Sequence, residues 1–148
     1  MSLLQESILI VTPDTQVNVL LQRILASFGM PVEAVDSASA LEAYLQDHLP
    51  VVVVLAENIA PTKGEGQPLD PWPVAERVLE HLPLCSVIML VRQETPEVLK
   101  KALQTGVDEV LCLPLRADLV NAVVKAGMAK MRARRDWLMI QARRDTAS

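Results

Sequence analysis

The residues of this chain that could carry chemistry are those that follow its predicted strands. The hydrophobic pattern predicts five units of a strand followed by a helix, and this architecture places ligands and catalytic groups in a crevice at the carboxyl ends of the strands. The residues expected at those ends are Thr12, Pro13, Ala56, Glu57, Val91 and Leu113. A site for phosphate or a metal ion needs carboxylates, hydroxyls and a cation there. Most of these groups are missing, so we predict no catalytic residue, no metal site and no cofactor.

Other parts of the sequence offer little further chemistry. His48 and His81 lie near predicted helix ends, and no nucleophile accompanies them. The segment after the first strand has no glycine-rich sequence that could surround a phosphate. Cys85 and Cys112 fall inside predicted strands, where buried unpaired thiols are more common than disulfides or metal ligands. An enzyme of another doubly wound family is kept as an alternative, although Asp14 and Glu57 are the only titratable groups that the sequence offers at the strand ends.

Short apolar runs and helical periodicity define the elements that position these residues. The predicted strands are 7–11, 31–35, 50–56, 85–91 and 109–113. The expected helix starts are Asp14, Ser39 in a capping box with Glu42, Asp70 before Pro71, and Thr95 before Pro96. Segment 60–73 is rich in glycine and proline and predicts a long loop that carries Trp72. Because parallel strands need helical crossovers, five such units predict a three-layer α/β sandwich.

Length and composition indicate one domain with an aliphatic core. The chain has 148 residues, of which 51% are hydrophobic and 3% aromatic. No apolar run is long enough to cross a bilayer, and the N-terminus lacks the features of a signal peptide, so we expect a cytoplasmic protein without membrane contacts. Residues 125–148 hold seven basic and two acidic side chains, whereas the rest of the chain holds seven basic and sixteen acidic ones. This contrast indicates either a separate role for the basic segment or a solvated helix end.

Two stretches in the second half of the chain carry a family resemblance. They are Ser86-Val87-Ile88-Met89-Leu90-Val91 and Ala102-Leu103-Gln104-Thr105-Gly106-Val107-Asp108-Glu109-Val110-Leu111-Cys112-Leu113-Pro114-Leu115. The first resembles the fourth strand of the receiver domain of two-component response regulators. The second resembles that family's Ala-Leu-x-x-Gly-Ala-Asp-Asp helix end and its Lys-Pro-Phe after strand five. The resemblance covers residues 7–127 and implies a flavodoxin-like, doubly wound sheet of five parallel strands in the order 2-1-3-4-5, with a cis Leu113–Pro114 peptide bond.

The same resemblance assigns the missing chemistry to particular positions. Active receivers hold Mg²⁺ with two acidic residues after strand one, where this chain has Thr12 and Pro13. Counting from neighbouring prolines places either Ala56 or Glu57 at the phosphoacceptor position. The family's phosphoryl-contacting hydroxyl, its lysine and its aromatic switch residue correspond to Val91, Leu113 and Val110. One glutamate cannot supply the oxygen shell that Mg²⁺ requires, so the resemblance implies a degenerate receiver, or pseudo-receiver.

Three features could still carry function. Glu57 either imitates a permanently phosphorylated aspartate or is a solvated residue on the rim of the crevice. Trp72, between two prolines, either anchors an interface or packs onto its own domain. A last helix runs without proline from residue 117 to about residue 144, far longer than the sheet needs. A heptad seam follows this helix through Val124, Met128, Met131, Arg135, Leu138 and Ala142.

These features lead to a division of the chain and a set of interaction candidates. We assign residues 1–127 to the receiver-like domain and 128–148 to an extension of the last helix that serves as a basic linker or a dimerisation segment. The interaction candidates are Trp72, Val110, Met128, Met131 and Leu138.

The sequence therefore predicts a non-enzymatic, phosphorylation-independent signalling module that acts by protein–protein association, as the regulatory domain of a bacterial response regulator. The expected partners are a second copy of the chain, bound through the fourth and fifth helices with strand five or through the last helix, and another protein or a covalently linked output domain. We do not expect direct nucleic-acid binding, because the basic helix has one aromatic residue, Trp137, and no base-reading motif. The alternatives are a receiver switched by a small molecule or nucleotide in the crevice, a still phosphorylatable atypical receiver, and an unrelated doubly wound domain.

Overall fold

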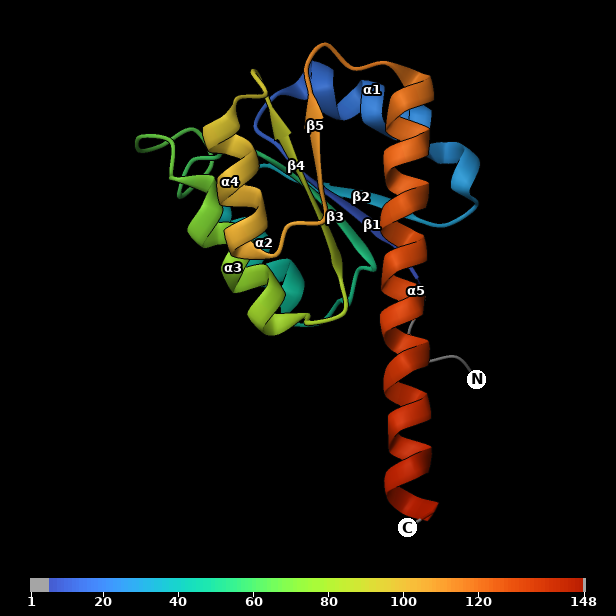
Figure 1. The fold of residues 1–148 in the computed structure, drawn as a ribbon. Coiled ribbons are helices and arrows are strands. Elements are labelled where there is room, and N and C mark those ends of the chain that lie inside the picture. Colours follow the sequence, from blue (N-terminus) through green and yellow to red (C-terminus); the bar gives the residue numbers. More distant parts are fainter. Residues whose placement is uncertain (1–5, 148) are drawn as a thin grey trace.

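A single parallel sheet organises the computed structural model, which describes residues 6–147 (Figure 1). Its strands are β1 (Ile8–Val11), β2 (Val32–Val35), β3 (Val52–Ala56), β4 (Ser86–Val91) and β5 (Glu109–Cys112). They pair in the order β2-β1-β3-β4-β5, and every pair is parallel. The predicted doubly wound α/β fold and its strand order are therefore confirmed. Strands β1, β3 and β4 are buried along their whole length, because helices cover both of their faces.

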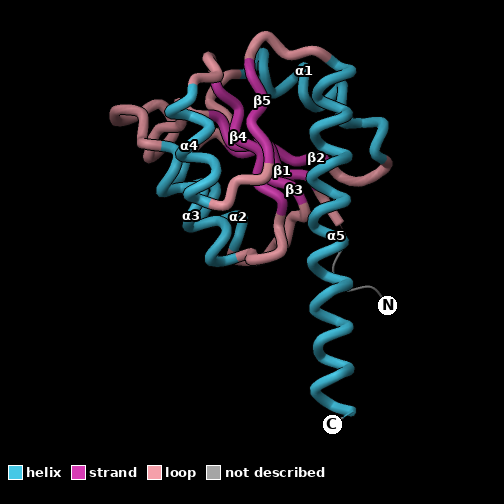
Figure 2. Tube along the Cα trace, in the orientation of Figure 1, coloured by secondary structure: helices cyan, strands magenta, loops and turns pink. Residues whose placement is uncertain are grey.

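Two layers of helices enclose the sheet. The helices are α1 (Thr15–Leu25), continued by a 3₁₀ turn (Ala26–Phe28), α2 (Ala38–Leu45), α3 (Pro71–His81), α4 (Pro96–Thr105) and α5 (Ala117–Ala147). Helices α1 and α5 pack on one face, and α2, α3 and α4 pack on the other (Figure 2). Each layer has its own buried cluster, and both clusters are almost entirely aliphatic. This agrees with a composition that is rich in Val, Leu and Ile and poor in aromatic residues.

The helix starts follow the predicted capping residues with one exception. Asp14, Asp70 and Thr95 each accept backbone N–H groups at the first turn of α1, α3 and α4. The capping box at Ser39 is wrong. Ser37 is the extended residue before α2, and its hydroxyl accepts the Ala40 N–H at 3.2 Å. Ser39 lies inside the first turn instead, with its hydroxyl 3.3 Å from that of Ser37.

Several predicted boundaries shift by a few residues. Trp72 lies in the first turn of α3 and not in the loop, because Asp70 caps the helix and Pro71 begins it. Cys85 lies just before β4, and Leu113 lies just after β5. The cis peptide bond between Leu113 and Pro114 is confirmed.

Helix α5 is much longer than the strands of the sheet on which it packs. It starts at the carboxyl edge of the strands, crosses the sheet, and continues well past the amino edge (Figure 1). Because α5 continues past the amino edge, its last turns project away from the domain, and we refer to residues 136–147 as the projecting segment.

None of the described helices, including α5 with its 31 residues, is both long and apolar enough to span a bilayer.

Candidate functional site

The part of the carboxyl-end crevice that lies between β1, β3, β4 and β5 is small. The cavity there has a volume of about 30 Å³, comparable to the share of one water molecule in the liquid. Its lining residues are Thr12, Asp14, Val17, Ala56, Glu57, Asn58, Leu90, Arg92 and Leu113. The structure therefore brings together most of the residues predicted for this edge, but it leaves almost no space between them.

Glu57 connects two strand ends. Ala56 is the last residue of β3, where it pairs in register with Leu90 of β4 and is buried. Glu57 follows directly, and its own N–H donates to the Leu90 carbonyl at 3.2 Å. Its carboxylate Oε1 accepts the backbone N–H of Arg92 at 2.7 Å. The carboxylate of Glu57 thus bonds the loop between β4 and α4 to the end of β3.

The oxygen atoms at the end of β1 are used within their own turn. The hydroxyl of Thr12 accepts the Asp14 N–H at 3.1 Å. The Asp14 carboxylate accepts the N–H groups of Gln16 and Val17 at 2.9 and 3.1 Å, as expected for a helix cap. Within residues 6–147, no group of three or more His, Cys, Asp or Glu side chains is arranged to hold a metal ion. These groups therefore build the start of α1.

Apolar residues occupy the positions where the family resemblance expects a hydroxyl, a lysine and an aromatic ring. Val91 is buried in the cluster beneath α3 and α4. Leu113 packs against the opposite cluster beneath α1 and α5, and its N–H donates to the Val91 carbonyl at 2.9 Å. Val110 is half-buried against the first cluster. These side chains contribute packing and present no hydrogen-bonding group to the cavity.

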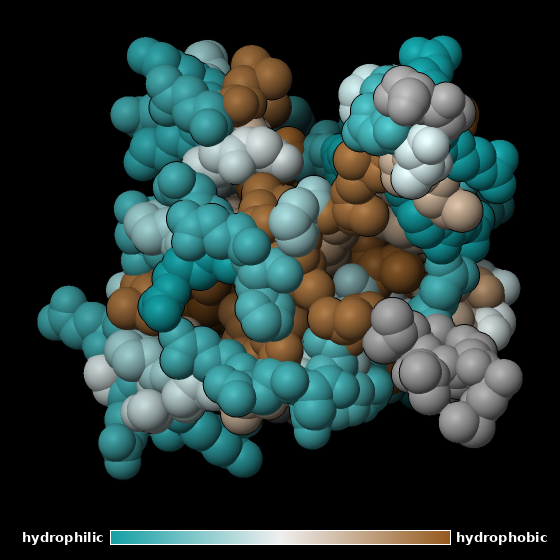
Figure 3. All heavy atoms as spheres, turned by 90° about the horizontal axis from the view of Figure 1, so that it is seen from below, coloured by the Kyte–Doolittle hydropathy of each residue, from teal (hydrophilic) through white to brown (hydrophobic). Residues whose placement is uncertain are grey.

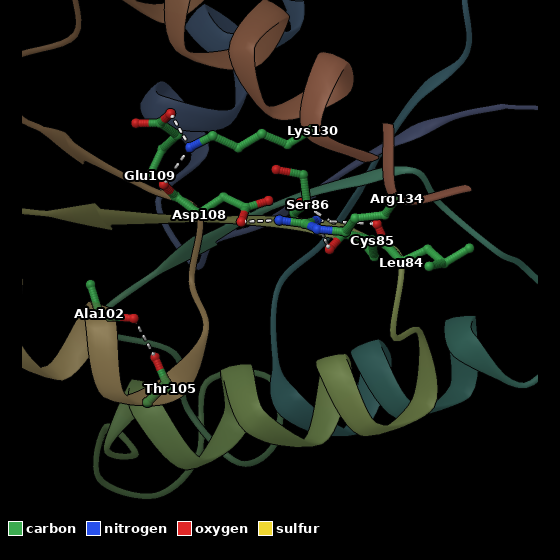
Figure 4. A network of polar contacts seen from close by, with 9 residues as sticks. All are labelled: Leu84, Cys85, Ser86, Ala102, Thr105, Asp108, Glu109, Lys130 and Arg134. Carbon is green, nitrogen blue, oxygen red and sulfur yellow. Dashed lines mark hydrogen bonds and ion pairs between the residues drawn. The ribbon is translucent and has the colours of Figure 1, made fainter. Parts of the chain in front are cut away.

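The most extensive polar network lies away from this crevice, near the amino edge of the sheet (Figure 4). Lys130 of α5 contacts the Glu109 carboxylate at 2.9 Å and the Asp108 carbonyl at 3.3 Å. Arg134, one turn further along, pairs with the Asp108 carboxylate and donates to the carbonyls of Leu84 and Cys85 at 3.4 Å each. The Asp108 side chain is only 9% exposed. The network therefore joins α5 to the segments that enter β4 and β5.

Close backbone packing adds to this attachment. A Cβ atom on Gly127 would lie 2.5 Å from the Ser86 hydroxyl, so only glycine allows α5 to approach β4 this closely. Met128 and Met131 follow on the same face and are buried against the domain. Two weaker ion pairs join Arg132 and Arg135 to Glu6, at 3.5 and 3.4 Å. The attachment of α5 to the domain thus extends to Arg135.

The structure separates the predicted interaction candidates into two groups. Trp72, Met128 and Met131 are buried in their own domain, so a partner could reach them only if they left the core. Leu138 is 48% exposed on the projecting segment. The domain boundary after Gly127 stays a prediction. Because contacts with the domain continue to Arg135, a truncation meant to remove only the projecting segment belongs after that residue.

The network around Arg134 was not anticipated from the sequence. Asp108 lies in the Gly-Val-Asp-Glu segment of the family resemblance, and Arg134 lies in the basic C-terminal segment. They are 26 residues apart, and no local pattern pairs them. The sequence signal nearest to this network is the excess of basic side chains in residues 125–148.

Comparison with solved structures identifies the fold. A CheY-like response regulator receiver domain protein from Methanospirillum hungatei JF-1 superposes with a TM-score of 0.73 at 18% identity, over 88% of this chain and 98% of that chain. NtrX from Brucella abortus matches with a TM-score of 0.79 at 20% identity, over 93% of this chain but only 30% of that chain. The receiver domain of NtrX taken alone gives 0.72 at 21% identity, over 82% and 98%. No protein-family model and no curated protein matches the sequence.

Proposed function

We propose that this chain, which has the fold of response regulator receiver domains, is a pseudo-receiver. It is a non-enzymatic signalling module whose state does not depend on phosphorylation and which acts by association with other proteins. The observation that carries this proposal is the 2.7 Å hydrogen bond from the Arg92 N–H to the Glu57 carboxylate. A permanent negative charge at the end of β3 already binds the loop that follows β4, without a phosphoryl group. Hydrogen bonds to an ionised acceptor are among the stronger ones in proteins.

The surroundings of Glu57 support the same conclusion. Phosphoryl transfer to a carboxylate needs a divalent cation that neutralises charge on the transferred oxygens. The Thr12 hydroxyl and Asp14 Oδ1, which could contribute to such a site, already accept backbone N–H groups. Val91 and Leu113 offer neither a hydroxyl nor a cation to a bound phosphoryl group. The cavity beside Glu57 measures about 30 Å³, comparable to the share of one water molecule in the liquid.

These features favour association with other proteins as the function of the chain. We include a homodimer, or a second protein or output domain, among the partners. The match to NtrX covers 30% of that chain, so a receiver fold can form a small part of a longer protein. A cytoplasmic location and a bacterial origin remain part of this proposal, and the two free cysteines are consistent with a cytoplasmic location.

The test is exposure to acetyl phosphate and Mg²⁺, read out by intact-mass spectrometry and by light scattering. We expect no mass increase and an unchanged assembly state. A Glu57→Gln variant serves as the matched control, because it removes the charge and keeps an acceptor for the Arg92 N–H. Stoichiometric addition of one phosphoryl group to the wild type, lost in this variant, would overturn the proposal.

One observation favours a second candidate, a receiver switched by a small molecule. A separate open hollow of about 570 Å³ lies over the ends of β1 and β2. It is lined in part by Asp14, Asp36 and Lys63, and the last two form an ion pair at 3.7 Å. Thermal unfolding with ATP, ADP and GTP tests this candidate. A rise in Tm that disappears in Lys63→Ala would favour it, and unchanged curves would exclude these nucleotides.

A further inference from the structure

We propose that the projecting segment of α5 pairs with the same segment of a second copy in antiparallel orientation. The seam of this pairing consists of Arg135, which directly precedes the segment, and of Leu138, Ala142 and Asp145 within it. The inference rests on the proposed association and specifies its surface and geometry.

An apolar surface extends from the base of the domain onto α5. A hollow of about 390 Å³ at the base is lined mainly by apolar residues, among them Leu49, Leu82, Leu84 and Met131. A second hollow shares Leu84 and continues along α5 to Trp137 and Leu138. The view from below shows hydrophobic surface gathered in a recess on this side of the molecule (Figure 3). An aqueous environment disfavours a contiguous surface of this kind, which is typical of an interaction site.

The seam of the projecting segment continues the row by which α5 packs on its own domain. Residues Val120, Val124, Met128 and Met131 are buried at steps of three or four along the helix. The same spacing continues through positions 135, 138, 142 and 145, below the sheet. Leu138 in this part of the row is 48% exposed. The helix face that is buried between Val120 and Met131 is therefore exposed to solvent at Leu138.

The charges in this row favour a second copy in one orientation. Positions 135 and 145 are equally far from position 140, and so are 138 and 142. A two-fold axis near Ile140 therefore places Arg135 opposite Asp145 of the second copy, and Leu138 opposite its Ala142. Both contacts occur twice, because the interface is symmetric. The ion pairs are complementary, and the large leucine faces the small alanine.

A parallel pairing lacks this complementarity. It would bring Arg135 onto Arg135 and Asp145 onto Asp145, and like charges in contact oppose association. The antiparallel arrangement also suits the overall shape. Residues 136–147 extend about 18 Å at the rise of an α-helix, so each helix end reaches the base of the other copy. There the basic end of the helix approaches a body whose charge is strongly acidic.

Charge reversal on the full chain tests the pairing, with the molar mass from light scattering as the readout. We expect a dimeric wild type. Arg135→Asp and Asp145→Arg should each be monomeric, because each places two like charges opposite one another. The double variant Arg135→Asp/Asp145→Arg should again be dimeric, because both pairs are restored with inverted sign.

Arg132→Asp is the matched control for these variants. Arg132 also contacts Glu6 but does not belong to the seam, so its reversal should leave the dimer intact. Far-UV circular dichroism shows whether each variant remains folded. If both single reversals stay dimeric, the seam is wrong although association stands. A monomeric wild type would contradict both this inference and the association part of the proposed function. Phosphorylation of Glu57 would overturn only the claim that the proposed function is independent of phosphorylation.

Cysteine crosslinking in a Cys112→Ser background determines the orientation. Mixed Leu138→Cys and Ala142→Cys chains should form a disulfide-linked heterodimer faster than either variant links to itself. Rapid self-linking of Leu138→Cys would indicate a parallel pair and overturn the inference.

Discussion

The two edges of the sheet differ in how completely their surfaces are used. At the carboxyl edge, Glu57, Thr12 and Asp14 all bind neighbouring backbone N–H groups, and the cavity between them is about 30 Å³. At the amino edge, an ion pair network anchors α5, and next to it lies an open apolar hollow of about 390 Å³. Receiver folds are expected to use the first edge. In this chain the side chains between β1, β3 and β4 bind their own backbone, and the open hollow of that edge, over β1 and β2, is partly polar. The hollow at the amino edge is mainly apolar and adjoins α5.

The comparison indicates where stability and function reside. The nearly buried Asp108 carboxylate and its ion pair with Arg134 hold α5 at the amino edge, so substitutions there should be costly. The hydrogen bond between Glu57 and Arg92 at the carboxyl edge is exposed and joins a loop to a strand end, so substitutions there should change the loop and leave the fold intact.

The largest effect is expected for Arg134→Ala. It leaves the Asp108 carboxylate nearly buried without its cation, which should lower the free energy of unfolding by about 3 kcal/mol. Urea denaturation measures this loss. Arg132→Ala removes an exposed ion pair and should cost less than about 1 kcal/mol. Equal losses in the two variants would show that the network does not anchor α5.

A smaller effect is expected for Gly127→Ala, which forces a methyl group against the Ser86 hydroxyl. We expect a loss of about 1–2 kcal/mol, since overpacking outweighs the better helix propensity of alanine. Ser86→Ala removes a buried hydroxyl that has no hydrogen-bond partner among the described residues and should be nearly neutral. The double variant should recover part of the loss. If the two changes are simply additive in thermal unfolding, the close approach is not the cause.

Cys85 provides a pH-dependent probe of the amino edge. Burial, and then the charge of Asp108, raises the pKa of this thiol from 9.0 to about 12. The folded chain therefore keeps the proton between about pH 9 and about pH 12, whereas the unfolded chain loses it. Stability is full below the unfolded pKa and falls as the pH rises through this window.

Chemical denaturation of the wild type and of Cys85→Ala across this window measures the contribution of the thiol. The variant should show the weaker pH dependence. Ellman's reagent at about pH 8 should label Cys112 before Cys85, because the buried thiol is protonated and shielded. Rapid labelling of Cys85 in the folded chain would contradict the packing described for this edge.

The smallest effect on stability is expected at the carboxyl edge. Glu57→Ala removes the acceptor for the Arg92 N–H and should cost about 1 kcal/mol. Hydrogen–deuterium exchange of residues 92–95 should become faster, while the exchange of β4 stays unchanged. Glu57→Gln keeps an acceptor, so the exchange rate of residues 92–95 in this variant should lie between those of the wild type and of Glu57→Ala. Unaltered exchange in the alanine variant would mean that this bond does not hold the loop.

Local signals in the sequence anticipated most of the elements but not all of their starts. Asp14, Asp70 and Thr95 cap the predicted helices. These caps are predictable, because the side chain of a capping residue accepts the backbone N–H of a residue only two or three positions later. The sequence favours Ser39 as a cap because Glu42 follows three residues later, as in a capping box, but Ser37 caps the helix. Only the extended backbone at Ser37 distinguishes them. Trp72 was assigned to the loop, because the prolines around it resemble those of an irregular segment.

Residue types at regular spacing are sufficient to predict the doubly wound fold and the apolar side chains of Val91 and Leu113 near two strand ends. Which groups meet depends on how the elements pack in three dimensions. The tertiary structure bonded Glu57 to Arg92 across two strands, and it paired Arg134 with Asp108 across 26 residues. It also showed that the heptad seam is buried as far as Met131 and exposed at Leu138. Periodicity assigns residues to one face of a helix, whereas the length of the strands determines how much of that face the domain covers.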